Sequence, residues 1–298
     1  GTAGTEDAGA DTGGSFGNAD AAKPCQPNEK NYDIPGNNCD DDGDGKVDNP
    51  PACDDGLAVT GEGADFAKAI GICDEASKRG FGLVSASFTR RFGANDAPKG
   101  EQHGILPKFG NIIKARQGSS LGVLSSGYAR EYDGTNGTTP FGGRTPNGKD
   151  WWGAINPFQG TGTVPPGYPR TAAGCPQLSS ATNDVIDLHL ELKAPPNAGG
   201  FKFDFNFYSG EWPAYICTTF NDAFIAYLTA KSFNAGHGDN ISFDSKNNAV
   251  SVNNGFFDRC TPNVQTGCEG APAPATSACP GGTDELQGTG FYNMGNYC

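Results

Sequence analysis

Residues 201–228 read FKFDFNFYSGEWPAYICTTFNDAFIAYL and carry the clearest structural signal in the chain. Phenylalanine occupies positions 201, 203, 205 and 207, and a polar residue or tyrosine follows each of them. Because successive side chains of a strand point to opposite faces, this alternation predicts a strand with four rings on its core face. The apolar run 223–228 predicts a second strand, buried on both sides. Together they predict the centre of a β-sandwich or barrel.

The connection between these two strands, residues 209–222, is polar and aromatic. Its carboxylate and amide groups are the hard oxygen ligands that suit a calcium ion. One interpretation is therefore a second cation site formed by Glu211, Asn221 and Asp222. The other is that Asp222 braces the loop through hydrogen bonds. No ligand-spacing rule decides between the two.

Composition limits the class of protein. The 298 residues include 45 glycines and 21 prolines with only 18% charged residues, which is typical of a mainly β protein with many turns. No apolar run approaches the roughly 20 residues of a spanning helix, so no membrane insertion is expected. The net charge of −13 argues against nucleic acid or an anionic membrane as a partner and suits cation binding.

Ten cysteines at wide, irregular spacings, with no CxxC pair, indicate disulfides and not a zinc or redox motif. They are Cys25, Cys39, Cys53, Cys73, Cys175, Cys217, Cys260, Cys268, Cys279 and Cys298. We expect all of them to be bonded, with at least one bridge inside 25–73 and one inside 258–298. A local bridge from Cys260 to Cys268 or Cys279 is expected, because short separations meet most readily. Since the chain does not begin with Met, we expect a removed signal peptide and an extracellular or cell-surface location.

The main chemical motif is CDDDGDGKVDNPPACDD, residues 39–55. Oxygen ligands recur on alternate residues, and glycine at the sixth position permits the sharp turn of a calcium-binding loop. The predicted Ca²⁺ ligands are Asp40, Asp42, Asp44, the carbonyl of Lys46 and Asp48. Acids packed this closely repel one another unless a cation neutralises them. The alternative is a solvated acidic turn.

The motif departs from a helix–loop–helix calcium site. Pro51 stands where the bidentate glutamate would be, and no helix flanks the loop. The motif resembles the calcium loops of thrombospondin type-3 repeats and the DDDGDGxxD modules of bacterial surface proteins. We expect Val47 to point inward and pin the loop. Cys39 and Cys53 bracket the loop and are positioned to staple it.

The chain divides into three parts: a low-complexity tail (1–24), a Cys/Asp-rich calcium-binding module (25–63) and a β-sandwich domain (64–298). In the third part, apolar residues at helical spacing predict one short helix over 64–79, with Phe66, Ala69, Ile70 and Cys73 as its stripe. Strands are expected at 82–90, 111–116, 120–125, 184–193, 201–208, 223–230, 240–244 and 249–253. In 184–193 the inward residues would be Ile186, Leu188, Leu190 and Leu192. The predicted fold is mainly β: a sandwich or jelly-roll-like core with long disulfide-tied loops at 127–182 and 258–285.

Several stretches together resemble the bacterial choice-of-anchor L domain family. They are GILPKFGN (104–111), LGVLSSGYA (121–129), residues 183–228, NISFDSKNNAVSVNNGFF (240–257) and LQGTGF (286–291). Glu211, Asn221 and Asp222 match polar positions of the family motif. The resemblance implies a secreted or surface-displayed β-rich domain with no established enzymatic activity. It also implies further strands after residue 291 that this chain does not include.

Three classes of function remain to be compared. A hydrolase is the least favoured class and no enzyme is expected, because the three histidines lie in no HExxH and no GxSxG occurs. A calcium-dependent carbohydrate-binding or adhesion module would stack glycans on Trp151, Trp152 and Trp212 in predicted loops. The favoured class is a structural protein of the bacterial cell surface or an extracellular fibre, stabilised by calcium and disulfides. Its partners would be further copies of itself or other surface proteins. A bolder hypothesis is that the tail 1–24 is ordered by a neighbouring copy, so that the protein assembles head to tail.

Overall fold

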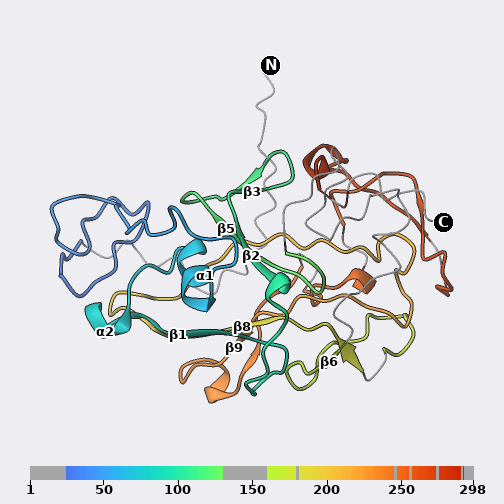
Figure 1. Ribbon diagram of the computed structural model, residues 1–298, viewed down its shortest axis with the longest axis horizontal. Helices are drawn as coiled ribbons and strands as arrows, with labels where there is room; N and C mark the ends of the chain where they lie inside the picture. The colour runs from blue at the N-terminus through green and yellow to red at the C-terminus, as the bar shows by residue number, and fades with distance from the viewer. Residues whose placement is uncertain are drawn as a thin grey trace.

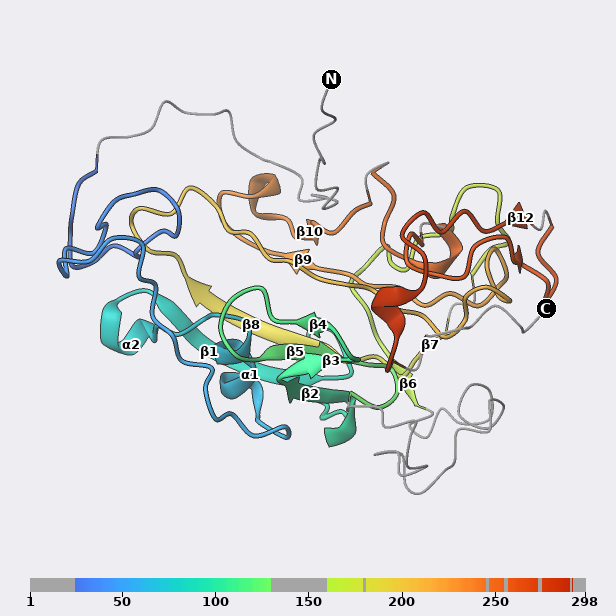
Figure 2. The same cartoon turned by 90° about the horizontal axis from the view of Figure 1, so that it is seen from above.

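The computed structural model describes residues 25–129, 160–178, 181–244, 247–254, 257–272, 275–289 and 291. In these residues the strands form six separate antiparallel pairs, joined by turns, short helices and long irregular segments. The mainly β class is therefore confirmed. No sandwich or jelly roll is formed by the part of the chain that the structure describes. The acidic module (blue) lies at one end of the molecule and the C-terminal segments (red) lie at the other (Figures 1 and 2).

The longest pair joins β1 (Gly82–Thr89) and β8 (Asp187–Lys193). It lies in the half of the molecule nearer the acidic module (Figure 1). It confirms the predicted strand 82–90 and most of 184–193. Phe88 lies opposite Leu188, and both rest on a core of α1 and β2 residues. The register shifts by one residue between Leu83 and Ser85. Beyond this bulge Leu192 is 49% exposed, so its predicted inward position is wrong.

The predicted helix over 64–79 is two helices, α1 (Gly63–Ala69) and α2 (Ala76–Arg79). Gly71 takes a φ of +85°, a left-handed conformation that ends the first helix. Phe66 and Ala69 are buried with Ile105 in the first core, as the stripe predicts. Ile70, however, is 45% exposed, because the chain turns away from the core there.

Five shorter pairs complete the described strands. They are β2 (His103–Leu106) with β5 (Leu121–Leu124), β3 (Lys108–Phe109) with β4 (Ile113–Lys114), β6 (Thr161–Gly162) with β7 (Thr182–Asn183), β9 (Tyr227–Leu228) with β10 (Asp239–Asn240), and β11 (Gln265–Thr266) with β12 (Ala275–Thr276). The 3-10 helices are η1 (Gly100–Gln102), η2 (Asn234–Gly236), η3 (Val252–Asn254) and η4 (Asp284–Leu286).

The remaining strand predictions are met unevenly. The prediction 120–125 is confirmed by β5, while 111–116 and 223–230 shrink to the two-residue strands β4 and β9. Most of 240–244 lies outside β10, and 249–253 forms isolated bridges before η3. The paired segments are short because the chain turns after a few residues, so little ladder forms.

The prediction for 201–208 is wrong in its main point. These residues belong to no strand, and three of the four phenylalanines are exposed: Phe201 by 62%, Phe203 by 41% and Phe205 by 37%. The alternation does keep the rings on one side, where they stack on one another. The ring of Phe205 also stacks on Phe224, with centroids 4.4 Å apart, but no described segment forms a strand ladder with 201–208.

A second core lies toward the C-terminal end. Trp212 is only 5% exposed and packs with Val252 and the cystine formed by Cys260 and Cys279. The expectation that Trp212 offers a glycan-stacking face is therefore wrong, because a buried ring presents no such face. Trp151 and Trp152 lie outside the described residues, as does the tail 1–24.

Four disulfides close the described chain: Cys25–Cys39, Cys53–Cys73, Cys175–Cys217 and Cys260–Cys279. Cys268 is also disulfide-bonded, and no described cysteine is free. The predicted bridges inside 25–73 and inside 258–298 are confirmed, as is Cys260 with Cys279. The staple of Cys39 to Cys53 is wrong, since each bonds to a cysteine outside the acidic loop. Four disulfides are consistent with an oxidising, extracellular compartment. No helix of the described residues is long and apolar enough to cross a membrane.

Candidate metal centre

Three carboxylates of the acidic loop come together. One oxygen from each of Asp40, Asp42 and Asp44 lies within 4.8 Å of the other two. The chain curls between them because Gly43 and Gly45 take φ values of +75° and +91°, which a side chain would oppose. The alternate spacing seen in the sequence thus becomes a convergent set of hard oxygens.

Backbone N–H groups hold these carboxylates in place. The N–H of Asp44 donates to Oδ1 of Asp40 over 3.0 Å and to Oδ1 of Asp42 over 3.2 Å. The N–H of Gly45 donates to the second oxygen of Asp40 over 3.0 Å. The N–H of Lys46 donates to Oδ1 of Asp44 over 2.8 Å. The carboxylates are therefore oriented before any ligand arrives.

A cationic side chain also lies beside the loop. Arg79, in α2, lies 3.4 Å from Oδ2 of Asp42 and 3.5 Å from Oδ1 of Asp74. Burial raises the pKa of Asp74; Arg79 lowers it and the charge of Asp42 raises it further. Hydrogen bonds from the Asn49 side chain and the Lys46 N–H lower the pKa of Asp44. Asp44, at least, is held in the charged form that a cation requires.

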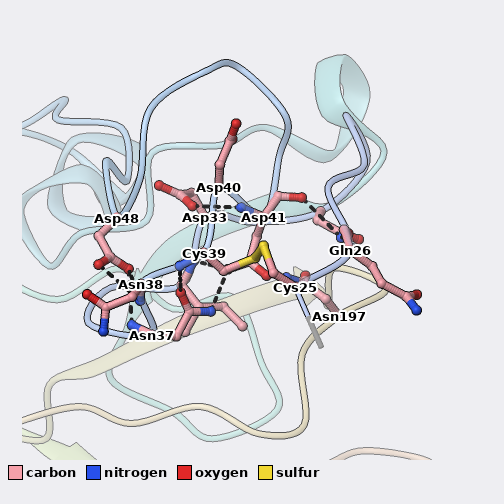
Figure 3. The surroundings of a disulfide bond; sticks show 12 residues. Cys25, Gln26, Asp33, Asn37, Asn38, Cys39, Asp40, Asp41, Asp48 and Asn197 are labelled. Carbon is pink, nitrogen blue, oxygen red and sulfur yellow. Dashed lines mark hydrogen bonds between the residues drawn. A yellow bond between two sulfur atoms is a disulfide. The ribbon is translucent and has the colours of Figure 1, made fainter. Parts of the chain in front are cut away.

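Two buried acids that the sequence analysis did not single out frame the loop. Asp33 is 2% exposed and accepts the N–H of Asp41 over 3.1 Å, and it also accepts the N–H of Asn49. Asp41 is 8% exposed and accepts the N–H of Ile34 and the amide of Asn37. Figure 3 shows both beside the Cys25–Cys39 disulfide, with Asp40 pointing away from them. The acids of this segment thus fall into two groups, the buried Asp33 and Asp41 that support the loop and the clustered Asp40, Asp42 and Asp44. Burial distinguishes the two groups, and residue type does not.

The other predicted ligands have different surroundings. The carboxylate of Asp48 accepts the backbone N–H groups of Asn37 (3.0 Å) and Asn38 (3.2 Å), as Figure 3 shows. Asp48 therefore joins the end of the acidic loop to the turn that precedes the loop. The expected inward position of Val47 is wrong, because its side chain is 54% exposed. The buried Asp33 and Asp41 take the pinning role that Val47 was expected to have.

Two sets of hydrogen bonds add to the Cys53–Cys73 disulfide and the Arg79–Asp42 ion pair in tying the module to the rest of the chain. Asp54 is buried and accepts the N–H groups of Ser119 (2.6 Å) and Ser120 (2.8 Å). Tyr32 and Asn197 exchange two hydrogen bonds of 3.1 and 2.8 Å through the Tyr32 backbone and the Asn197 side chain. Ordering of the acidic loop is thereby coupled to segments far away in the sequence.

The second predicted site is a buried carboxyl pair. Oε2 of Glu211 accepts the N–H of Asp222 over 3.2 Å, and Ser209 donates its hydroxyl to Asp222. Burial, and then the charge of Asp222, raises the pKa of Glu211 to about 8. Burial likewise raises the pKa of Asp222. The side-chain oxygen of Asn221 instead accepts the backbone N–H of Asn253 over 3.0 Å. The bracing role of Asp222 is thus visible, and a cation site at Glu211, Asn221 and Asp222 stays a prediction.

Comparisons with family models, with curated proteins and with solved structures found no match to this chain. The resemblance to choice-of-anchor L domains, drawn from the sequence, therefore stays a prediction.

Proposed function

We propose that the protein is a non-enzymatic structural protein of the cell exterior whose acidic loop binds one calcium ion. The observation that carries this proposal is the convergence of Asp40, Asp42 and Asp44 on a loop whose N–H groups already orient their oxygens. Exposed acidic clusters also occur without a metal. The proposal therefore rests on the N–H groups that orient the carboxylate oxygens and on the buried carboxylates of Asp33 and Asp41.

Calcium suits this loop better than zinc or magnesium. The cluster offers only carboxylate oxygens, which are hard ligands, and no histidine or cysteine thiolate belongs to it. Calcium accepts an irregular set of six to eight oxygens, whereas magnesium demands a near-ideal octahedron. The carbonyl of Lys46 and water would complete the shell, with Asp48 bracing the loop from outside. A bound ion would stabilise the folded module by mass action.

We predict that the full chain binds one Ca²⁺ and that Asp40→Asn with Asp44→Asn abolishes this binding. Isothermal titration calorimetry measures binding, and thermal melts in EDTA and in excess calcium measure the linked stability. The matched control is Asp55→Asn, an exposed acid in the same segment but outside the cluster. The wild type should melt higher with calcium, while the double variant should melt at one temperature in both. Equal wild-type melts with and without calcium would contradict the proposal.

The structural role is supported by the disulfides and by the buried frame of the module. Calcium and covalent bridges together would make a fold that resists protease and drying. A β-sandwich, as the resemblance implies, belongs to this proposal and would need segments beyond the described pairs. Trp212 does not support the alternative of a glycan-binding module, because its ring is buried.

A further inference from the structure

Residues 201–206 form an exposed aromatic ridge. All six residues are exposed, and at one end the ring of Phe205 also stacks on Phe224 with centroids 4.4 Å apart. The ring centroids of Phe201 and Phe203 are 6.1 Å apart, and those of Phe203 and Phe205 are 5.8 Å apart. These spacings are close to the two-residue repeat of a strand, about 6.6 Å, and fit an extended backbone. A contiguous apolar surface of this kind marks an interaction site more often than chance exposure does.

The backbone of residues 203–206 of the ridge is available for pairing. Residues 203–208 make no backbone hydrogen bond to any other described residue. An extended segment with open N–H and C=O groups is a template for another strand. In Figures 1 and 2 the gold segment after β8 turns back near the module and runs without an arrow toward the C-terminal part.

Both ends of the ridge are held. Before it, Asn197 is bonded to Tyr32 of the acidic module. After it, Ser209 is bonded to Asp222, and Phe207 contacts Phe257 with ring centroids 6.2 Å apart. A segment fixed at both ends is presented in its binding conformation, which lowers the entropy lost on pairing.

We propose that two copies of this chain associate by antiparallel pairing of their ridges, with Phe203 of one copy opposite Phe203 of the other. Such a contact uses the same patch on both copies and closes as a two-fold dimer. It deepens the structural role proposed above by naming a surface for self-association. It does not depend on calcium binding by the loop.

The charges of the ridge select this register. Antiparallel pairing centred on Phe203 places Lys202 of each copy opposite Asp204 of the other and stacks three phenylalanine pairs. Centring on Lys202 would oppose two lysines, and centring on Asp204 would oppose two aspartates. Opposite charges across a strand pair stabilise it, whereas like charges directly opposite destabilise it. Asp204 also lies 3.6 Å from Arg116, an exposed ion pair that a second copy can share or replace.

Charge reversal tests the register. Analytical ultracentrifugation of the full chain, up to high concentration because the paired surface is small, should show a monomer–dimer equilibrium. Lys202→Asp alone and Asp204→Lys alone should each weaken dimerisation at least ~10-fold, since each creates two like-charge pairs. A mixture of the two variants should form heterodimers, because every aspartate then faces a lysine. Lys231→Asp, an exposed charge reversal outside the ridge, is the matched control.

A wild type that stays monomeric at every concentration would overturn the proposal. So would single variants that dimerise like the wild type, or a mixture that fails to restore association. Circular dichroism of each variant checks that the fold is intact. Calcium titration of the same samples measures ion binding by the acidic loop independently of dimerisation. Failure of the dimer proposal is therefore distinguishable from failure of the calcium proposal.

Discussion

Raising the pH from about 5 to about 9 in EDTA is expected to lower the free energy of unfolding, and Glu211→Gln is expected to remove a large share of that loss. Burial and the neighbouring Asp222 raise the pKa of Glu211 from 4.5 to about 8. The folded protein therefore keeps a proton that the unfolded chain has released. This contribution is full below pH 4.5 and is lost as the pH rises through 8.

Each pH unit between the two pKa values contributes about 1.4 kcal/mol. The interval from about pH 5 to the folded pKa of about 8 spans about three units, so the expected loss is about 4 kcal/mol. Urea unfolding of wild type and Glu211→Gln at both pH values measures it. Glutamine keeps an oxygen to accept the Asp222 N–H and carries no proton to lose. Glu269→Gln, an exposed glutamate, is the control. Parallel pH profiles for wild type and Glu211→Gln would contradict the assignment.

The same experiment with excess calcium tests the second cation site. A cation would neutralise the pair as a proton does. If the prediction at Glu211, Asn221 and Asp222 holds, calcium restores stability at about pH 9 in the wild type and does so less in Glu211→Gln. A calcium effect of equal size in both proteins would assign the ion to the acidic loop alone.

Trp212→Ala is expected to destabilise the protein by about 3–5 kcal/mol, because it removes a large ring from a core that cannot collapse around the gap. Trp212 packs with Val252 and with the Cys260–Cys279 cystine, and both cysteines are 3% exposed. Denaturant unfolding measures the loss. The matched control is Phe220→Ala in the same connection, where the ring is 59% exposed and a loss within about 1 kcal/mol is expected. Equal losses from the two variants would show that the core is not centred on Trp212.

The sequence alone determined features that depend on neighbours along the chain. Alternation over 184–193 identified most of β8, since side-chain direction in a strand follows from local geometry. The spacing of Asp40, Asp42 and Asp44 placed three carboxylates on one curl, because glycine between them permits the turn. Cysteine count and spacing identified disulfides as a class and a local bridge from Cys260, and the structure chose Cys279 over Cys268 as its partner.

Tertiary structure decided what depends on distant partners. The alternating run 201–208 has the pattern of a core strand, but a strand needs a neighbour, and no described segment pairs with it. The pairing of Cys53 with Cys73, across the start of the helical region, replaced the expected staple. Asp33 and Asp41 support the acidic loop because folding buries them. Asp40 and Asp44 are the same residue type, but they stay accessible to a cation. The local periodicity of a sequence determines the direction in which its side chains point. The burial of those side chains and the pairing of strands and cysteines depend on which segments meet in space.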